Sequence, residues 1–144
     1  MEITTGSAEE MENAAAEFAG RLAPREDGAT VVALSGELGA GKTTFARGMA
    51  RAFGIEEDIT SPTYVIEKIY APARGPFTHL IHIDAYRLSG AHELDILGWK
   101  ELIGEPGNLI ILEWPEQVKG AVPEDAICVS LSGTDGQSRT ISIA

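Results

Sequence analysis

The 144-residue chain has one cysteine, few aromatic residues (6%) and no long apolar run. A single cysteine excludes an intramolecular disulfide, and Met1 is followed by no basic, apolar leader, so we expect a protein of the reducing cytoplasm. No apolar run approaches the length that spans a bilayer, so we predict no membrane association. Cys128 lies in an apolar, strand-like run, and we expect it to be a small buried side chain.

An excess of basic residues is also absent. Eleven Lys and Arg residues are scattered among 22 Asp and Glu residues, which gives a net charge of −11. Proteins that grip nucleic acid present basic patches to the phosphates, so tight direct binding of RNA or DNA by this chain is disfavoured. Any role in nucleic-acid chemistry would act through a partner protein. The length and the apolar fraction of 44% are typical of one globular domain, residues 1–144.

The segment from Gly36 to Thr43 matches the phosphate-binding pattern G-x-x-x-x-G-K-[ST]. A β-branched, apolar run (30–34) precedes it, and a segment with helical spacing of apolar residues (44–53) follows. Glycines let backbone N–H groups surround phosphate oxygens, and the helix that begins at Lys42 directs its free N–H groups at the same anion. We expect Lys42 to bridge the β- and γ-phosphates and the Thr43 hydroxyl to hold Mg²⁺. The sequence therefore predicts a nucleoside triphosphate site.

The remaining elements alternate between helices and strands. Ser7 and Glu10 form a capping box that begins an amphipathic helix ending before Pro24. Two strands connected as a hairpin are predicted at 64–70 and 78–83, followed by a helical segment at 91–102 that breaks at Gly98. A further apolar strand is predicted at 108–112, and a terminal β-hairpin at 126–131 and 138–143. This order indicates an α/β fold, a P-loop NTPase-like three-layer sandwich with a mixed central sheet.

Two predicted strands end in an acid, Asp84 and Glu113. Ligands of doubly wound sheets bind at the carboxyl ends of strands, and P-loop proteins place their second magnesium-associated carboxylate there. Glu113 fits this role better because four apolar residues precede it without interruption. The other acid could orient the attacking water, and the sequence leaves open which of the two touches the metal. His82 is expected to pack near the nucleotide, and a zinc site is disfavoured because ligands at zinc spacing are lacking.

Two further features remain ambiguous in the sequence. The segment 60–63, with the hydroxyls of Ser61 and Thr63, falls where nucleotide switches place a residue that senses the γ-phosphate, although such a tripeptide is commonly a plain turn. Trp114 follows Glu113 and precedes Pro115, and it is either a core aromatic residue or a platform beside the site.

Four blocks in register closely resemble the bacterial TsaE (YjeE) family across essentially the whole chain. They are the phosphate loop 36–44, the segment 61–64, the run 82–88 and the tetrad 113–116. Ala85 is one departure, since the family more often has leucine there. The resemblance implies a cytoplasmic, Mg²⁺-dependent ATPase that assists the TsaB–TsaD pair in forming threonylcarbamoyladenosine at position 37 of tRNAs that read codons starting with A. It implies that the ATPase does not itself transfer the threonylcarbamoyl group.

The same resemblance assigns roles to individual residues. Glu113 would be the magnesium-associated acid, Asp84 an acid needed for hydrolysis, and Thr63 the switch threonine. The helix start at Ser7 would lie near the adenine. The phosphate-contacting loop would comprise Glu37, Leu38, Gly39, Ala40, Gly41, Lys42, Thr43 and Thr44.

The resemblance also implies that hydrolysis by the isolated protein is weak. No arginine is obviously positioned to stabilise the transition state, which would explain slow hydrolysis, and a partner would then complete the site. Two alternatives use the same loop. A small-molecule kinase normally needs an acceptor pocket and an arginine-rich lid, which this length does not accommodate. A nucleotide-gated assembly module would need bound nucleotide but not turnover.

Overall fold

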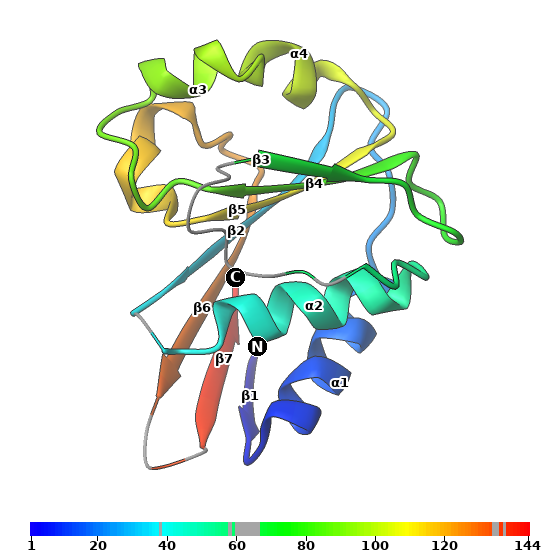
Figure 1. The fold of residues 1–144 in the computed structure, drawn as a ribbon, viewed down its shortest axis with the longest axis vertical. Helices are drawn as coiled ribbons and strands as arrows, with labels where there is room; N and C mark the ends of the chain where they lie inside the picture. The colour runs from blue at the N-terminus through cyan, green and yellow to red at the C-terminus, as the bar shows by residue number, and fades with distance from the viewer. Residues whose placement is uncertain (38, 58, 60–66, 134–135, 137) are drawn as a thin grey trace.

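The computed structural model describes residues 1–37, 39–57, 59, 67–133, 136 and 138–144, and these form a seven-stranded mixed sheet (Figure 1). The strand order is β1-β7-β6-β2-β5-β4-β3. The strands are β1 (Glu2–Thr5), β2 (Thr30–Gly36), β3 (Glu67–Tyr70), β4 (His79–Asp84), β5 (Asn108–Glu113), β6 (Ile127–Gly133) and β7 (Arg139–Ile143). The central strands β6, β2, β5 and β4 are parallel, whereas β3, β7 and β1 pair antiparallel at the two sides. The predicted mixed sheet is confirmed.

Helices cover both faces of this sheet (Figure 1). Helices α1 (Ala8–Gly20) and α2 (Lys42–Ala52) pack on one face around a core that includes Phe18, Phe45 and Met49. The other face is covered by α3 (His92–Ile96), α4 (Trp99–Gly104) and the 3₁₀ helix η1 (Pro115–Ala121). The three-layer sandwich is therefore confirmed. In the part of the chain that is described, no helix is long and apolar enough to cross a membrane.

Local signals placed most element boundaries correctly. The Ser7 hydroxyl accepts from the Glu10 N–H (3.1 Å), and Glu10 accepts in return from the Gly6 N–H (3.0 Å), so the capping box is present. Gly98, with φ of 80°, separates α3 from α4 as predicted. Strand β5 is buried at all six positions, as expected for an apolar strand between two parallel neighbours.

Two features differ from the sequence analysis. Cys128 is exposed, so the expectation of a buried thiol was wrong. It lies on β6, where buried and exposed positions alternate, and its apolar neighbours along the chain hid this alternation. Strand β1 was not predicted, because four residues carry little periodicity and this strand forms through pairing with the distant β7.

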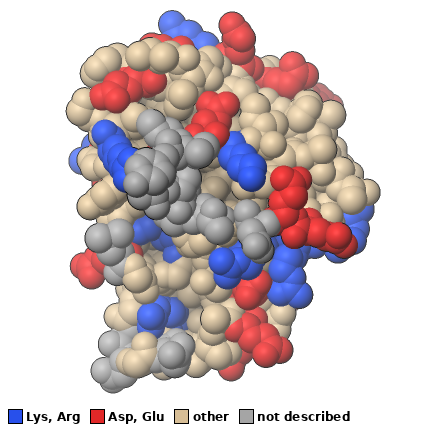
Figure 2. Space-filling model, viewed as in Figure 1, with Lys and Arg blue, Asp and Glu red and all other residues tan. Residues whose placement is uncertain are grey.

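The fold also gathers basic residues that are scattered in the sequence. Arg47, Arg51 and Arg74 line one cavity of about 380 Å³ together with Glu56 and Glu57. Arg51 pairs with Glu12 (3.0 Å), and Arg74 donates to the carbonyls of Arg51 and Ala52 (2.9 and 3.1 Å). Basic and acidic side chains accordingly lie side by side on the face shown in Figure 2. This mixture is not the uniform basic patch of a nucleic-acid binder.

Helices α1 and α2 approach each other closely at Gly48. A Cβ at this position would lie 2.8 Å from the Cβ of Ala15 and would also meet the Glu12 backbone carbonyl. Real side chains do not tolerate such contacts, and backbone cannot move aside cheaply. Glycine at position 48 therefore sets the distance between the helix that follows the phosphate loop and the N-terminal helix.

We predict that Gly48→Ala lowers the free energy of unfolding by about 1–3 kcal/mol, because overpacking outweighs the gain in helix propensity. Gly20→Ala is the matched control, since a Cβ there meets nothing within 4 Å. It should leave stability unchanged or raise it by about 0.5 kcal/mol. Urea denaturation of the three proteins measures both changes, and equal stability of the two variants would contradict the packing argument.

Candidate nucleotide-binding site

The loop between β2 and α2 has the backbone that its glycines predict. Gly39 and Gly41 have φ of 81° and 104°, values that side chains other than glycine rarely adopt, and Gly41 immediately precedes the first residue of α2. At Gly36 a Cβ would come within 2.7 Å of the Leu131 carbonyl oxygen. The free N–H groups of the first turn of α2 thus open toward the loop. Leu38, one of the predicted contacts, lies outside the described residues.

Lys42 is held inside this loop and is only 6% exposed. Its Nζ donates to the carbonyl oxygens of Gly36 and Glu37 (3.2 Å for Glu37), and it lies 3.9 Å from the ring centroid of Trp114. Burial lowers the pKa of Lys42, and the negative charges of Glu113, Glu116 and Asp84 oppose that shift. A buried ammonium group is therefore placed between loop carbonyls, an aromatic face and nearby carboxylates.

Asp84 and Glu113, which were predicted to end two strands, lie next to each other. They are paired residues in the parallel register of β4 and β5, and Glu113 also pairs with Leu34 of β2, two residues before the phosphate loop. The Ala85 N–H donates to the Glu113 carbonyl oxygen (3.0 Å), which keeps the two chains together beyond the strands. Both acids thus reach the same edge of the sheet as Lys42.

The two carboxyl groups have different surroundings. Glu113 is 2% exposed, and its Oε2 is hydrogen-bonded to Nε2 of the equally buried His82. Asp84 is partly exposed and accepts from the Tyr86 N–H (3.0 Å). Burial raises the pKa of Asp84, the Tyr86 hydrogen bond opposes this, and the charge of Glu113 raises it further. Glu113 is held firmly by its neighbour, whereas Asp84 faces outward and binds protons more readily than an ordinary aspartate.

Trp114 meets both alternatives left by the sequence, because it packs against the core beneath α3 and α4 and also lies beside Lys42. Among the described residues it alone combines a positive φ (59°) with a side chain, a conformation that costs of order 1–3 kcal/mol. Its backbone N–H donates to the Leu34 carbonyl oxygen (3.3 Å), and its ring packs against the Tyr86 ring with centroids 4.9 Å apart. The unusual backbone turns the indole ring over Lys42, so Trp114 is a platform at the loop.

A second cavity, of about 180 Å³, opens between the start of α1 and the loop. Its lining residues are Ser7, Ala8, Met11, Gly39, Gly41, Thr44 and Arg139. This places Ser7 and Thr44 beside the loop. Thr43 follows Lys42 in the first turn of α2 and is partly buried. The switch candidates Ser61 and Thr63 lie outside the residues that the structure describes.

Arg139 is the residue that sequence reasoning missed. It lies 100 positions after Gly39, yet its Nη2 donates to the Gly39 carbonyl oxygen (3.2 Å). Its Nη1 donates to the carbonyls of Gly136 and Ser138 (2.8 Å each). No local pattern marks this arginine, because the pairing of β7 with β6 and β1 brings it to the loop. A guanidinium group thus joins the C-terminal hairpin to the phosphate loop.

Comparisons with known proteins identify the family of this chain. Residues 5–141 match the family model of "Threonylcarbamoyl adenosine biosynthesis protein TsaE". The TsaE protein of Treponema pallidum is 38% identical over 83% of this chain and 84% of its own length. The TsaE protein of Rickettsia prowazekii is 37% identical over 97% of this chain and 92% of its own length. The crystal structure of Bacillus subtilis YdiB superposes with a TM-score of 0.77 at 28% identity, covering 99% of this chain and 83% of that one. The chain belongs to the TsaE family of threonylcarbamoyladenosine biosynthesis proteins.

Proposed function

We propose that this protein binds ATP with Mg²⁺ and hydrolyses it in support of the TsaB–TsaD complex, which forms N6-threonylcarbamoyladenosine at position 37 of tRNAs that read codons starting with A. The observation that carries the proposal is the convergence of Lys42, Asp84 and Glu113 beside the glycine-rich loop. Family membership supports the pathway, and the residues below support the chemistry.

The loop fits a triphosphate. Gly39 and Gly41 hold the backbone in conformations that turn N–H groups inward, and the first turn of α2 supplies further N–H donors. Lys42 already donates to two carbonyls, and phosphate oxygens would replace at least one of these acceptors. A charged oxygen is the stronger acceptor, so this exchange favours binding. Ser7 and Arg139 border the adjoining cavity, where the nucleoside would lie.

The residues present also fit Mg²⁺, which prefers oxygen ligands and retains several waters. Thr43 and Glu113 would hold the ion, with Asp84 either beside it or bound through water. When bound, the ion neutralises charge on the β- and γ-phosphates. His82 holds the Glu113 carboxylate in one orientation, and such support commonly tunes a metal ligand. Asp84, with its raised pKa and outward position, is suited to orient the attacking water and accept its proton.

The geometry also supports slow hydrolysis by the isolated protein. The guanidinium group of Arg139 donates to three carbonyl oxygens, and Arg47 donates to the Ile59 carbonyl (3.4 Å). Arg51 is paired with Glu12. A cation at the γ-phosphate in the transition state would then come from a partner, which would make turnover depend on complex formation.

Replacing Lys42 with alanine should weaken ATP binding about 10- to 100-fold, because a charge-assisted donor to phosphate is lost. Isothermal titration calorimetry with Mg²⁺ and ATP measures the change. Lys100→Ala removes the same charge from an exposed side chain of α4, away from the loop, and this variant should bind ATP as the parent protein does. Equal affinities of the parent and the Lys42 variant would contradict the loop assignment.

Glu113→Gln and Asp84→Asn should separate metal binding from water activation. Both variants should still bind ATP, and both should lose hydrolysis by about 100-fold or more, the range that a positioned acid or base contributes. Glu113→Gln should raise the Mg²⁺ concentration needed for half-maximal activity, whereas Asp84→Asn should lower kcat at unchanged Mg²⁺ dependence. Identical Mg²⁺ curves for both variants would refute this division of roles.

Adding purified TsaB–TsaD should raise the steady-state ATPase rate of this protein at least tenfold, since a partner cation is worth that much or more. Modification assays with tRNA should show many rounds of product only when hydrolysis-competent protein is present. An equal ATPase rate with and without the complex would refute partner stimulation. Many rounds of modification with Glu113→Gln would favour a nucleotide-gated assembly module.

A further inference from the structure

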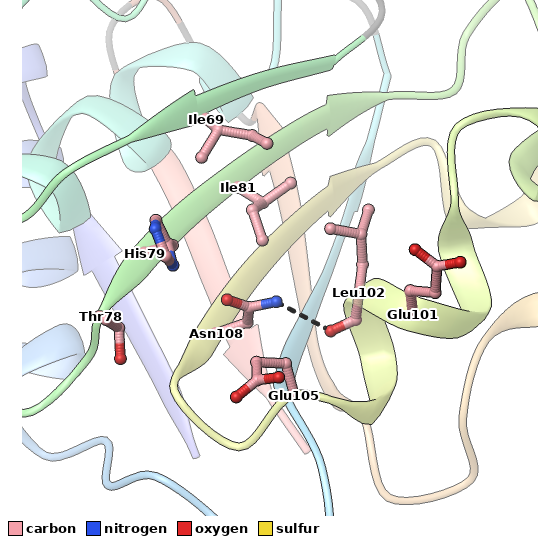
Figure 3. A pocket seen from close by; sticks show the side chains of 8 residues that line it. All are labelled: Ile69, Thr78, His79, Ile81, Glu101, Leu102, Glu105 and Asn108. Carbon is pink, nitrogen blue, oxygen red and sulfur yellow. Dashed lines mark hydrogen bonds between the residues drawn. The ribbon is translucent and has the colours of Figure 1, made fainter.

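A groove of about 350 Å³ lies between α4 and the β3–β4 side of the sheet (Figure 3). Thr78, His79 and Asn108 border it at the beginning of β4 and β5. Asp84 and Glu113 stand at the opposite ends of these six-residue strands, about 16 Å away at a rise of about 3.3 Å per residue. The groove is therefore separate from the nucleotide site.

The floor of the groove is apolar. Ile69 and Ile81 are paired in the register of β3 and β4, and Leu102 of α4 lies on the other side. Ile81 is buried, but Ile69 is 52% exposed, one of the large apolar side chains that the described residues leave open to solvent. Covering Ile69 with an apolar stem would remove this surface from water.

The wall of the groove is acidic. Glu101 of α4 and Glu105, which follows the last residue of α4, both line the groove and are exposed. Neither has an ion-pair partner among the described residues. A cation at either carboxylate would gain an ion pair, whereas a phosphate or a carboxylate would be repelled.

A buried polar group also faces the groove. Asn108 is only 5% exposed, and its Nδ2 donates to the Leu102 carbonyl oxygen (3.0 Å). The amide oxygen points away from this bond and toward the His79 side of the groove (Figure 3). It offers an acceptor to an N–H donor that enters between the apolar floor and the acidic wall.

We propose that this groove docks a lysine or arginine side chain that an extended segment of a partner protein presents. The aliphatic stem would lie on Ile69 and Leu102, and the charged head would meet one of the two carboxylates, Glu101 or Glu105. The apolar floor favours a protein segment over a free polyamine, since an apolar neighbour of the basic residue can cover Ile69 as well. The volume, at the low end of the range of about 300–1,000 Å³ for ligand pockets, suits one or two side chains.

The test titrates the full-length, ¹⁵N-labelled protein with the capped pentapeptides GLRLG and GLELG and follows amide shifts by NMR. GLRLG should shift the resonances of Ile69, Leu102 and Asn108, and GLELG should not. The double variant Glu101→Gln/Glu105→Gln should bind GLRLG about threefold to tenfold more weakly, as expected for the loss of both exposed negative charges. Ile69→Thr, which keeps a β-branched side chain, should weaken binding about threefold.

Glu26→Gln/Glu124→Gln removes the same charge from exposed positions outside the groove and should bind GLRLG as the parent protein does. Unchanged thermal melting confirms that each variant is folded. Four results would overturn the proposal: no binding of GLRLG at millimolar concentration, equal binding of GLELG, undiminished binding by the Glu101/Glu105 variant, or equal shifts and affinity with spermidine alone.

Discussion

The parallel register of β4, β5 and β2 is the constraint on which the site depends. Pairing of Asp84 with Glu113 and of Glu113 with Leu34 fixes two carboxylates beside the loop without any specialised local structure. The strands are buried on both faces, and their alternate residues belong to two different cores. A shift of one residue in the pairing would therefore move every apolar side chain of a strand from one core to the other. The energy that specifies the register is hydrophobic, and the positions of the acids follow from it.

Burial then determines which partners the titratable groups of the site require. Lys42, His82 and Glu113 are each almost completely withdrawn from solvent, and such groups are tolerated only when they are paired. His82 and Glu113 satisfy each other, while Lys42 relies on loop carbonyls and the Trp114 ring. The strained backbone of Trp114 is consistent with this demand, because it directs an aromatic face at a buried ammonium group.

Local patterns sufficed for the loop, for the capping box of α1 and for the two strand-end acids, because each feature is encoded by neighbouring residues. The sequence predicted that both acids end strands, but their adjacency depends on the parallel pairing of β4 with β5, which no local pattern encodes. Arg139 and β1 were missed because they depend on strands paired across most of the chain. The exposure of Cys128 was missed because its apolar neighbours hid the alternation of β6. The orientation of Trp114 required a backbone conformation that its sequence neighbours do not signal.

The pairing of β1 with β7 brings the two ends of the described chain together, with the Met1 amino group donating to the Ile143 carbonyl and the Ile143 N–H donating to Met1. Ser7 follows β1 and Arg139 begins β7, so residues near both ends of the described chain line one small cavity. Any ligand that fills this cavity contacts residues near both ends of the described chain. By thermodynamic linkage, a ligand that binds only while β1 and β7 are paired stabilises this pairing, by an amount that grows with the ligand concentration.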